Sequence, residues 1–202
     1  MPSPVCSRTG FRKSPRSCLL LSLILLVCGT AFGKIEHRAE ITAHPEYMEI
    51  SVFVNGADPQ VLFQNLDEGM TARLEYEVRV SQPRSLPLRI LGSRVLQQYR
   101  VVYDLRWDPF RRRFTITTQD GGAFTFTHTT ALWQFFFELP GFRVPWRNLG
   151  LEHHASNGRY LVETRVTYEP IVFVPGLSIL SLLLPRARQS STWWSDAVEA
   201  PR

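Results

Sequence analysis

Residues 71–80 alternate between apolar and polar side chains without a break. The apolar positions are Ala72, Leu74, Tyr76, Val78 and Val80. A strand places such a set on one face because its side chains repeat every two residues, whereas a helix with 3.6 residues per turn scatters them. This segment therefore predicts a strand with one face in a core and the other in water.

Shorter or weaker alternation marks six more segments, at residues 35–43, 48–54, 99–107, 114–116, 123–127 and 160–168. Their polar outer faces are typical of antiparallel sheets packed face to face. Asp108-Pro109 and residues 120–122 (Asp-Gly-Gly) supply turns that join neighbouring segments into hairpins. We expect a mainly β fold, an antiparallel β-sandwich of about seven or eight strands with two short helices.

The first expected helix covers residues 58–69, where Asp58 caps the start, Pro59 takes the first helical position and Gly69 ends it. The second covers residues 130–139, and its apolar stripe is Leu132, Phe135, Phe136 and Leu139. Pro140-Gly141 should end this helix. Residues 140–158 then form the longest irregular stretch, which makes them a place to look for function.

The N-terminal residues have the pattern of a targeting segment. Basic residues without an acid precede an apolar run at residues 18–28, and Ala31 and Gly33 give the small-x-small pattern of a cleavage site. We predict a signal peptide at residues 1–33, cleavage between Gly33 and Lys34, and an exported single domain at residues 34–202 in the bacterial periplasm or cell envelope.

Two alternatives to cleavage remain open at this point. The apolar stretch to Gly33 has sixteen residues, fewer than the roughly 20 that span a bilayer as a helix, so a retained membrane anchor is the second choice. A lipoprotein anchored at Cys28 is the third, because Val27 stands where the lipobox of bacterial lipoproteins needs Gly, Ala or Ser.

Removal of residues 1–33 changes the chemistry that the chain offers. All three cysteines leave with the segment, so the mature domain has no disulfide, thiolate metal site or cysteine nucleophile. Four of the 23 basic residues and none of the 18 acidic ones precede Lys34, which leaves 19 against 18. This near-neutral domain gives no electrostatic support for binding nucleic acid.

Four features of the chain are distinctive: the order of these segments, the Asp-Pro-Phe-Arg-Arg-Arg turn at residues 108–113, the aromatic helix near Trp133 and the Trp-Trp-Ser ending at residues 193–195. In these features the chain resembles the bacterial exported proteins grouped as domain-of-unknown-function family 4390. The resemblance covers residues 35–195. It implies export and an unassigned function, and it carries over no catalytic residue.

Three groups of residues are candidates for a site. His128, His153 and His154 lack the spacing of a metal-binding motif, so we predict no metal ligand among them. The run Arg111-Arg112-Arg113 fits either a solvated hairpin turn, which we favour, or a contact with phosphate or an anionic membrane. Aromatic candidates for a partner contact fall outside the expected core stripe; they are Phe137, Trp146, Trp193 and Trp194.

The most apolar stretch of the mature chain is residues 171–184. It is too short to span a bilayer and is interrupted by Pro175-Gly176. We favour a buried strand here over an exposed edge that docks a partner or a membrane.

No catalytic or cofactor motif is recognisable in the sequence, including a P-loop, a nucleophile elbow or a dinucleotide-binding glycine pattern. We therefore expect a non-catalytic envelope module without cofactor that contacts a protein partner or a membrane surface. The alternative is an unrecognised hydrolase or metal-assisted enzyme that uses His128, His153 or His154.

Overall fold

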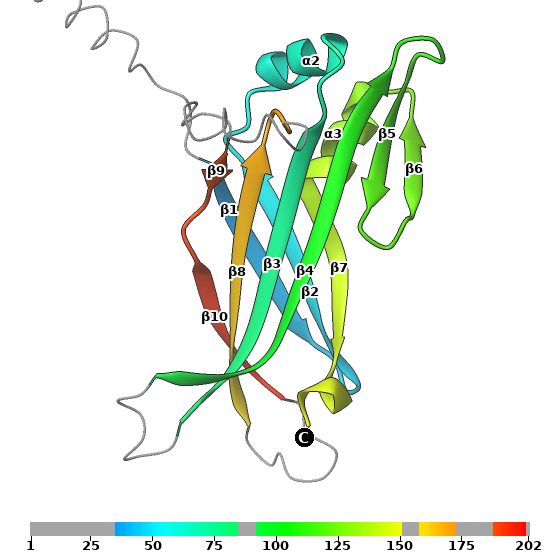
Figure 1. Ribbon diagram of the computed structural model, residues 1–202. Coiled ribbons are helices and arrows are strands. Elements are labelled where there is room, and N and C mark those ends of the chain that lie inside the picture. Colours follow the sequence, from blue (N-terminus) through cyan, green and yellow to red (C-terminus); the bar gives the residue numbers. More distant parts are fainter. Residues whose placement is uncertain (1–34, 85–91, 151–157, 173–187, 201–202) are drawn as a thin grey trace, which may run out of the picture. The chain divides into compact units, whose positions relative to one another are not determined.

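The computed structural model describes residues 35–84, 92–150, 158–172 and 188–200, all within one compact unit, Gly33–Arg202. The predicted cleavage site at Gly33 and Lys34 lies outside the described residues, as does most of the apolar stretch 171–184. Within the described ranges the fold is an antiparallel β-sandwich with ten strands and two α-helices (Figure 1). The expected fold class is therefore confirmed.

Two sheets make up the sandwich. The small sheet has the order β1-β2-β7, with β1 at Glu36–Ala43, β2 at Tyr47–Asn55 and β7 at Glu138–Pro145. The large sheet has the order β10-β8-β3-β4-β5-β6, and β9 pairs with β8. Its strands are β3 at Ala72–Pro83, β4 at Ser93–Asp108, β5 at Arg113–Thr118, β6 at Ala123–Phe126, β8 at Arg159–Glu169, β9 at Gln189–Ser190 and β10 at Trp194–Glu199.

The apolar face predicted for residues 71–80 is confirmed, because all five of its side chains are buried in β3. They meet the buried side chains of β2, which are Met48, Ile50, Val52 and Val54. Tyr76 lies in this core, and its hydroxyl donates a hydrogen bond of 3.1 Å to the backbone oxygen of Phe136. The alternation of both strands therefore produces one core between the two sheets.

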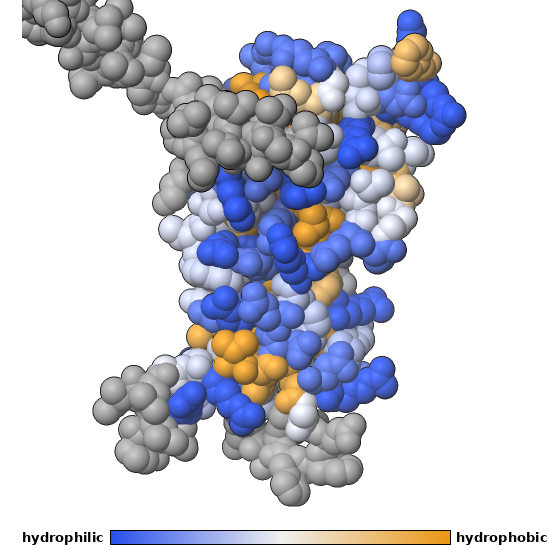
Figure 2. All heavy atoms as spheres, in the orientation of Figure 1, coloured by the Kyte–Doolittle hydropathy of each residue, from blue (hydrophilic) through white to orange (hydrophobic). Residues whose placement is uncertain are grey.

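The opposite face of the large sheet carries cross-strand ion pairs. Arg73 bonds Asp104 at 2.7 Å, Arg100 bonds Glu75 at 2.5 Å, and Arg165 bonds Glu77 at 2.5 Å. Arg100 covers Glu75 so closely that this outward-facing carboxylate is itself buried. Figure 2 shows that this face is largely hydrophilic.

Both expected helices are present, with one change of boundary. Helix α2 spans Pro59–Asp67, and the carboxylate of Asp58 accepts hydrogen bonds from the first backbone N–H groups as predicted. Helix α3 spans Thr129–Phe137 and ends earlier than expected, because the chain enters β7 at Glu138. The described helices are too short or too polar to cross a membrane.

The expectation of an irregular segment at residues 140–158 was wrong for its first part. Residues 138–145 form β7, and a bulge in the register with β2 accommodates Pro140 and Gly141. Gly141 takes a positive φ of 58° there and donates its N–H to the hydroxyl of Ser51 at 3.1 Å. A proline is tolerated because β7 is an edge strand. The 3-10 helix η2 follows at Trp146–Leu149.

Candidate functional site

Strand β4 has an open edge over more than half of its length. It pairs with β3 from Ser93 to Leu105, but β5 pairs only with the part from Tyr103 to Asp108. Residues 93–102 therefore have no strand on their second side among the described residues. Alternate backbone N–H and C=O groups on such an edge point away from the sheet and remain available for another strand.

An apolar groove with a volume of about 620 Å³ lies beside this edge. It runs between β4, the end of α3 and β7, and the turn between β5 and β6 forms one wall. Its lining residues are Arg100, Val101, Val102, Tyr103, Thr118, Gln119, Asp120, Phe124, Phe135, Leu139 and Phe142. The groove therefore combines aromatic walls with a free backbone edge.

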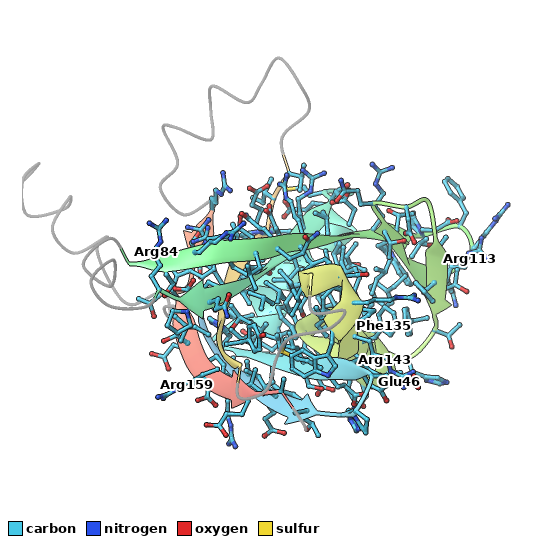
Figure 3. The ribbon with its side chains drawn as sticks, turned by 90° about the horizontal axis from the view of Figure 1, so that it is seen from below. Glu46, Arg84, Arg113, Phe135, Arg143 and Arg159 are labelled. Atoms are coloured by element: carbon cyan, nitrogen blue, oxygen red, sulfur yellow. The ribbon has the colours of Figure 1, made fainter. Side chains whose placement is uncertain are left out.

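Phe135 is the centre of the aromatic wall. Its ring lies 4.8 Å from that of Phe124, 5.1 Å from that of Phe126 and 5.7 Å from that of Tyr103, measured between centroids. Phe124 remains 44 % exposed although its ring packs on that of Phe135. Figure 3 shows Phe135 on the same side of the domain as Arg143 and away from Arg84 and Arg159. An exposed aromatic wall of this kind can accept an apolar side chain.

Two charged side chains stand at the rim of the groove. Hydrogen bonds from the Thr118 hydroxyl and from the N–H of Gly122 lower the pKa of Asp120, which keeps this exposed carboxylate ionised. The ion pair with Glu75 raises the pKa of Arg100. The rim therefore holds one negative and one positive group in fixed positions, while the floor is apolar.

A second hollow of about 590 Å³ lies at the other end of the large sheet, where Arg84, Arg159 and Tyr160 line it. Residues of β3, β4, β8 and β10 contribute to its lining.

The structure corrects the surface assignment of Phe137 and Trp146. Phe137 is only 2 % exposed and packs on Trp133 and Tyr168, with centroid distances of 4.3 and 5.6 Å. Trp146 is 8 % exposed, and its indole N–H donates a 2.7 Å hydrogen bond to the backbone oxygen of His44. Neither ring is available to a partner, because the chain turns from α3 into β7 and then η2 and carries both rings into the core.

Trp193 and Trp194 are half-buried. The guanidinium groups of Arg79 and Arg165 lie over the ring of Trp193, at 4.3 and 4.7 Å from its centroid. Trp194 lines a small hollow of about 180 Å³ that also contains His37. Trp193 therefore covers the charged face of its own sheet, and contact of either tryptophan with a partner stays a prediction.

Among the histidines singled out from the sequence, the structure describes only His128, which is exposed at the residue preceding α3. His153 and His154 lie outside the described residues. In the described part of the chain no group of three or more metal-ligating side chains is found.

Sequence reasoning missed one histidine contact. The Nε2 atom of His37 lies 3.1 Å from the backbone oxygen of Thr164 and 2.9 Å from its hydroxyl. A carbonyl oxygen can only accept, so Nε2 carries the proton and acts as a donor. It cannot remove the proton of the hydroxyl in this state, and the pair joins the two sheets rather than forming a nucleophile with its base.

Comparison with known proteins gave no relative: the chain matches no family model, no curated protein and no solved structure. The resemblance to domain-of-unknown-function family 4390 therefore stays a prediction.

Proposed function

We propose that this domain is a non-catalytic binding module of the bacterial cell envelope, and that it takes an extended apolar segment of a partner protein along the open edge of β4. One observation carries the proposal: a stretch of β4 that has no second neighbouring strand among the described residues lies directly beside an apolar groove of about 620 Å³. The location in the envelope rests on the sequence of residues 1–33 alone.

An extended segment fits this site better than a compact ligand. Added as a strand, it would pair its backbone with residues 93–102, which supplies affinity without regard to sequence. Alternate side chains would point to the same side, so one of them can enter the groove against Phe124 and Phe135. The groove then supplies the preference for a bulky apolar residue. The charges of Arg100 and Asp120 select the residues that flank this apolar residue in the bound segment.

The rival hydrolase has less support from the described residues. Its candidate His128 makes no side-chain hydrogen bond to an acidic or nucleophilic group among the described residues, and the His37–Thr164 pair has the wrong direction of donation for a base. A binding module should tolerate replacement of His128, His153 and His154 by Gln. Unchanged peptide binding is therefore the expected result for that triple variant.

The test is selection from a displayed library of random peptides of about ten residues, long enough to form a strand. We expect the full-length protein to select peptides with alternating β-branched residues around one bulky apolar residue. The variant Phe124→Ser should bind them about tenfold more weakly or worse, because burying a phenylalanine-sized surface contributes roughly 1.5–3 kcal/mol. Phe110→Ser is the matched control, since Phe110 is 96 % exposed but lies outside both the groove and the open edge of β4.

Hydrogen exchange supplies the second readout. Backbone amides within residues 100–102 that point away from β3 should exchange more slowly when a selected peptide is bound, because a new strand occupies their N–H groups. Equal binding by wild type and Phe124→Ser, or unchanged exchange at these residues, contradicts the proposal.

A further inference from the structure

The hairpin turn between β4 and β5 is built as a fixed projection. One carboxylate oxygen of Asp108 accepts hydrogen bonds from the backbone N–H groups of Phe110 and Arg111, each at 3.1 Å. Arg112 takes a left-handed conformation with φ at 47°, which is rare for a residue with a side chain. At the base of the turn the rings of Trp107 and Phe114 pack with centroids 4.4 Å apart. The turn is thus held at both its tip and its base.

This turn presents an aromatic ring entirely to water. Phe110 is 96 % exposed, the highest value among the large apolar side chains of the described residues. The other two large apolar side chains with substantial exposure, Val95 and Phe124, are exposed to about half that extent. Other rings of the same chain, such as Phe137, are buried in the core. The exposure of Phe110 therefore results from its position at the tip of the turn.

The arginines beside Phe110 differ from those of the large sheet. Arg73, Arg100 and Arg165 each bond a carboxylate at 2.5–2.7 Å. At the tip, Arg111 reaches Asp108 only at 3.9 Å, and Arg112 and Arg113 have no ion pair among the described residues. Three arginines and one aspartate leave residues 107–114 with a formal charge of +2. The positive charge of the turn is therefore available to an anionic surface.

We propose that the turn at residues 108–113 docks on an anionic lipid bilayer, with Phe110 entering the boundary between headgroups and acyl chains and Arg111 to Arg113 contacting lipid phosphates. This surface is separate from the groove of the proposed function. Clusters of arginine with an aromatic residue suit the membrane interface, because the ring is buried while the guanidinium groups remain among the phosphates.

The shape of the turn favours a bilayer over a protein partner. A stable protein interface buries about 1,200–2,000 Å² in total, and its anchoring rings fill pockets within a broad surface. A narrow hairpin turn with one exposed ring offers a much smaller area to a protein partner. A bilayer accepts a single inserted side chain and adds about 1 kcal/mol for each nearby basic residue, so the same small surface is sufficient for weak docking.

The test uses the full-length protein with Phe110 replaced by the photoreactive analogue p-benzoylphenylalanine. It is mixed with vesicles of phosphatidylcholine that contain about 30 % phosphatidylglycerol, which imitates an anionic leaflet. Irradiation should give lipid adducts at position 110, with at least about fivefold more adduct than on pure phosphatidylcholine. The same analogue at Val95 is the control, because that side chain is exposed on a sheet far from the turn, and it should give little adduct on either vesicle.

Charge variants extend the test. Arg111→Gln with Arg113→Gln should lower the adduct at position 110 by about fivefold for each charge removed, and high salt should do the same. This double variant keeps the left-handed residue in place, so the turn should fold. The matched control Arg94→Gln with Arg159→Gln removes two exposed arginines near the other end of the strands and should change nothing.

Several results would overturn the inference. Equal adduct at positions 110 and 95, equal adduct on neutral and anionic vesicles, or equal loss in the two arginine variants would each exclude docking through this turn. Adducts formed at position 110 in intact cells with protein and not with lipid would assign the surface to a protein partner instead. None of these outcomes depends on peptide binding in the groove.

Discussion

Two phenylalanine side chains of this domain differ completely in their exposure to solvent. Phe137 is enclosed by Trp133, Phe136 and Tyr168, whereas Phe110 touches almost nothing. Phe110 lies in the Asp-Pro-Phe-Arg-Arg-Arg turn that the sequence predicted to be solvated, whereas the sequence did not predict the burial of Phe137. The difference arises from the direction in which the chain continues, into the sandwich after α3 and into water at the β4–β5 turn.

Replacing Phe137 by Ala should lower the free energy of unfolding by about 3–5 kcal/mol, because the change leaves a cavity between α3 and the large sheet. Phe110→Ala should change it by no more than about 0.5 kcal/mol, as expected for an exposed position. Chemical denaturation of the two variants measures both values. A Phe137→Ala protein as stable as wild type would show that the ring is not in the core.

Single elements of the fold carry their own signals in the sequence. Helix α2 begins at the residue after Asp58, whose carboxylate accepts the N–H of Gln60 at 2.9 Å, and ends before Gly69, which has a φ of 81°. Strand β7 contradicts its local sequence signal, because Pro140 and Gly141 predicted the end of a helix followed by an irregular segment. Pairing with β2 through a bulge overrides that local signal.

The cap of α2 gives a prediction at this scale. Asp58→Ala should lower the free energy of unfolding by about 1 kcal/mol, since two backbone N–H groups lose their acceptor. Asp67→Ala, at the last residue of the same helix, removes a negative charge from the end where the helix dipole disfavours it, and should be neutral or slightly stabilising. Thermal melting of the two variants would show a lower Tm only for Asp58→Ala; equal melting would mean that the cap contributes nothing.

The two sheets of the whole domain are joined differently at their two sides. On one side, His37 of β1 donates to Thr164 of β8. On the other, the rings of Tyr99 in β4 and Phe142 in β7 meet edge to face at 5.3 Å, and the groove opens next to them. One side is therefore closed by a partly buried polar contact, while the other leaves an accessible edge among the described residues.

The contact at His37 predicts a pH dependence of stability. Burial lowers the pKa of His37 below its ordinary value of 6.5, and the hydrogen bond to Thr164 offsets this only in part. As the pH falls below about 6.5 the unfolded chain takes up a proton that the folded chain does not, so stability is lost, by at most about 1.4 kcal/mol per pH unit for one group.

Denaturation at several pH values checks this dependence. His37→Gln should weaken the loss of stability on acidification, because Gln can still donate to Thr164 but does not titrate in this range. His128→Gln, at an exposed position, should keep the wild-type profile. If both variants follow wild type, His37 does not contribute to the pH dependence.

The sequence by itself determined the layers of this protein and several of their details. Period-two alternation identified β2, β3 and much of β4, and Asp58, Gly69 and the Asp-Pro turn marked ends of elements, because these signals depend on neighbours within a few residues. Only the tertiary structure decided which edges meet. It placed β7 beside β2, buried Phe137 and Trp146, and left β4 open next to Phe124 and Phe135. Those outcomes depend on contacts between residues far apart in the chain, and a local pattern carries no information about them.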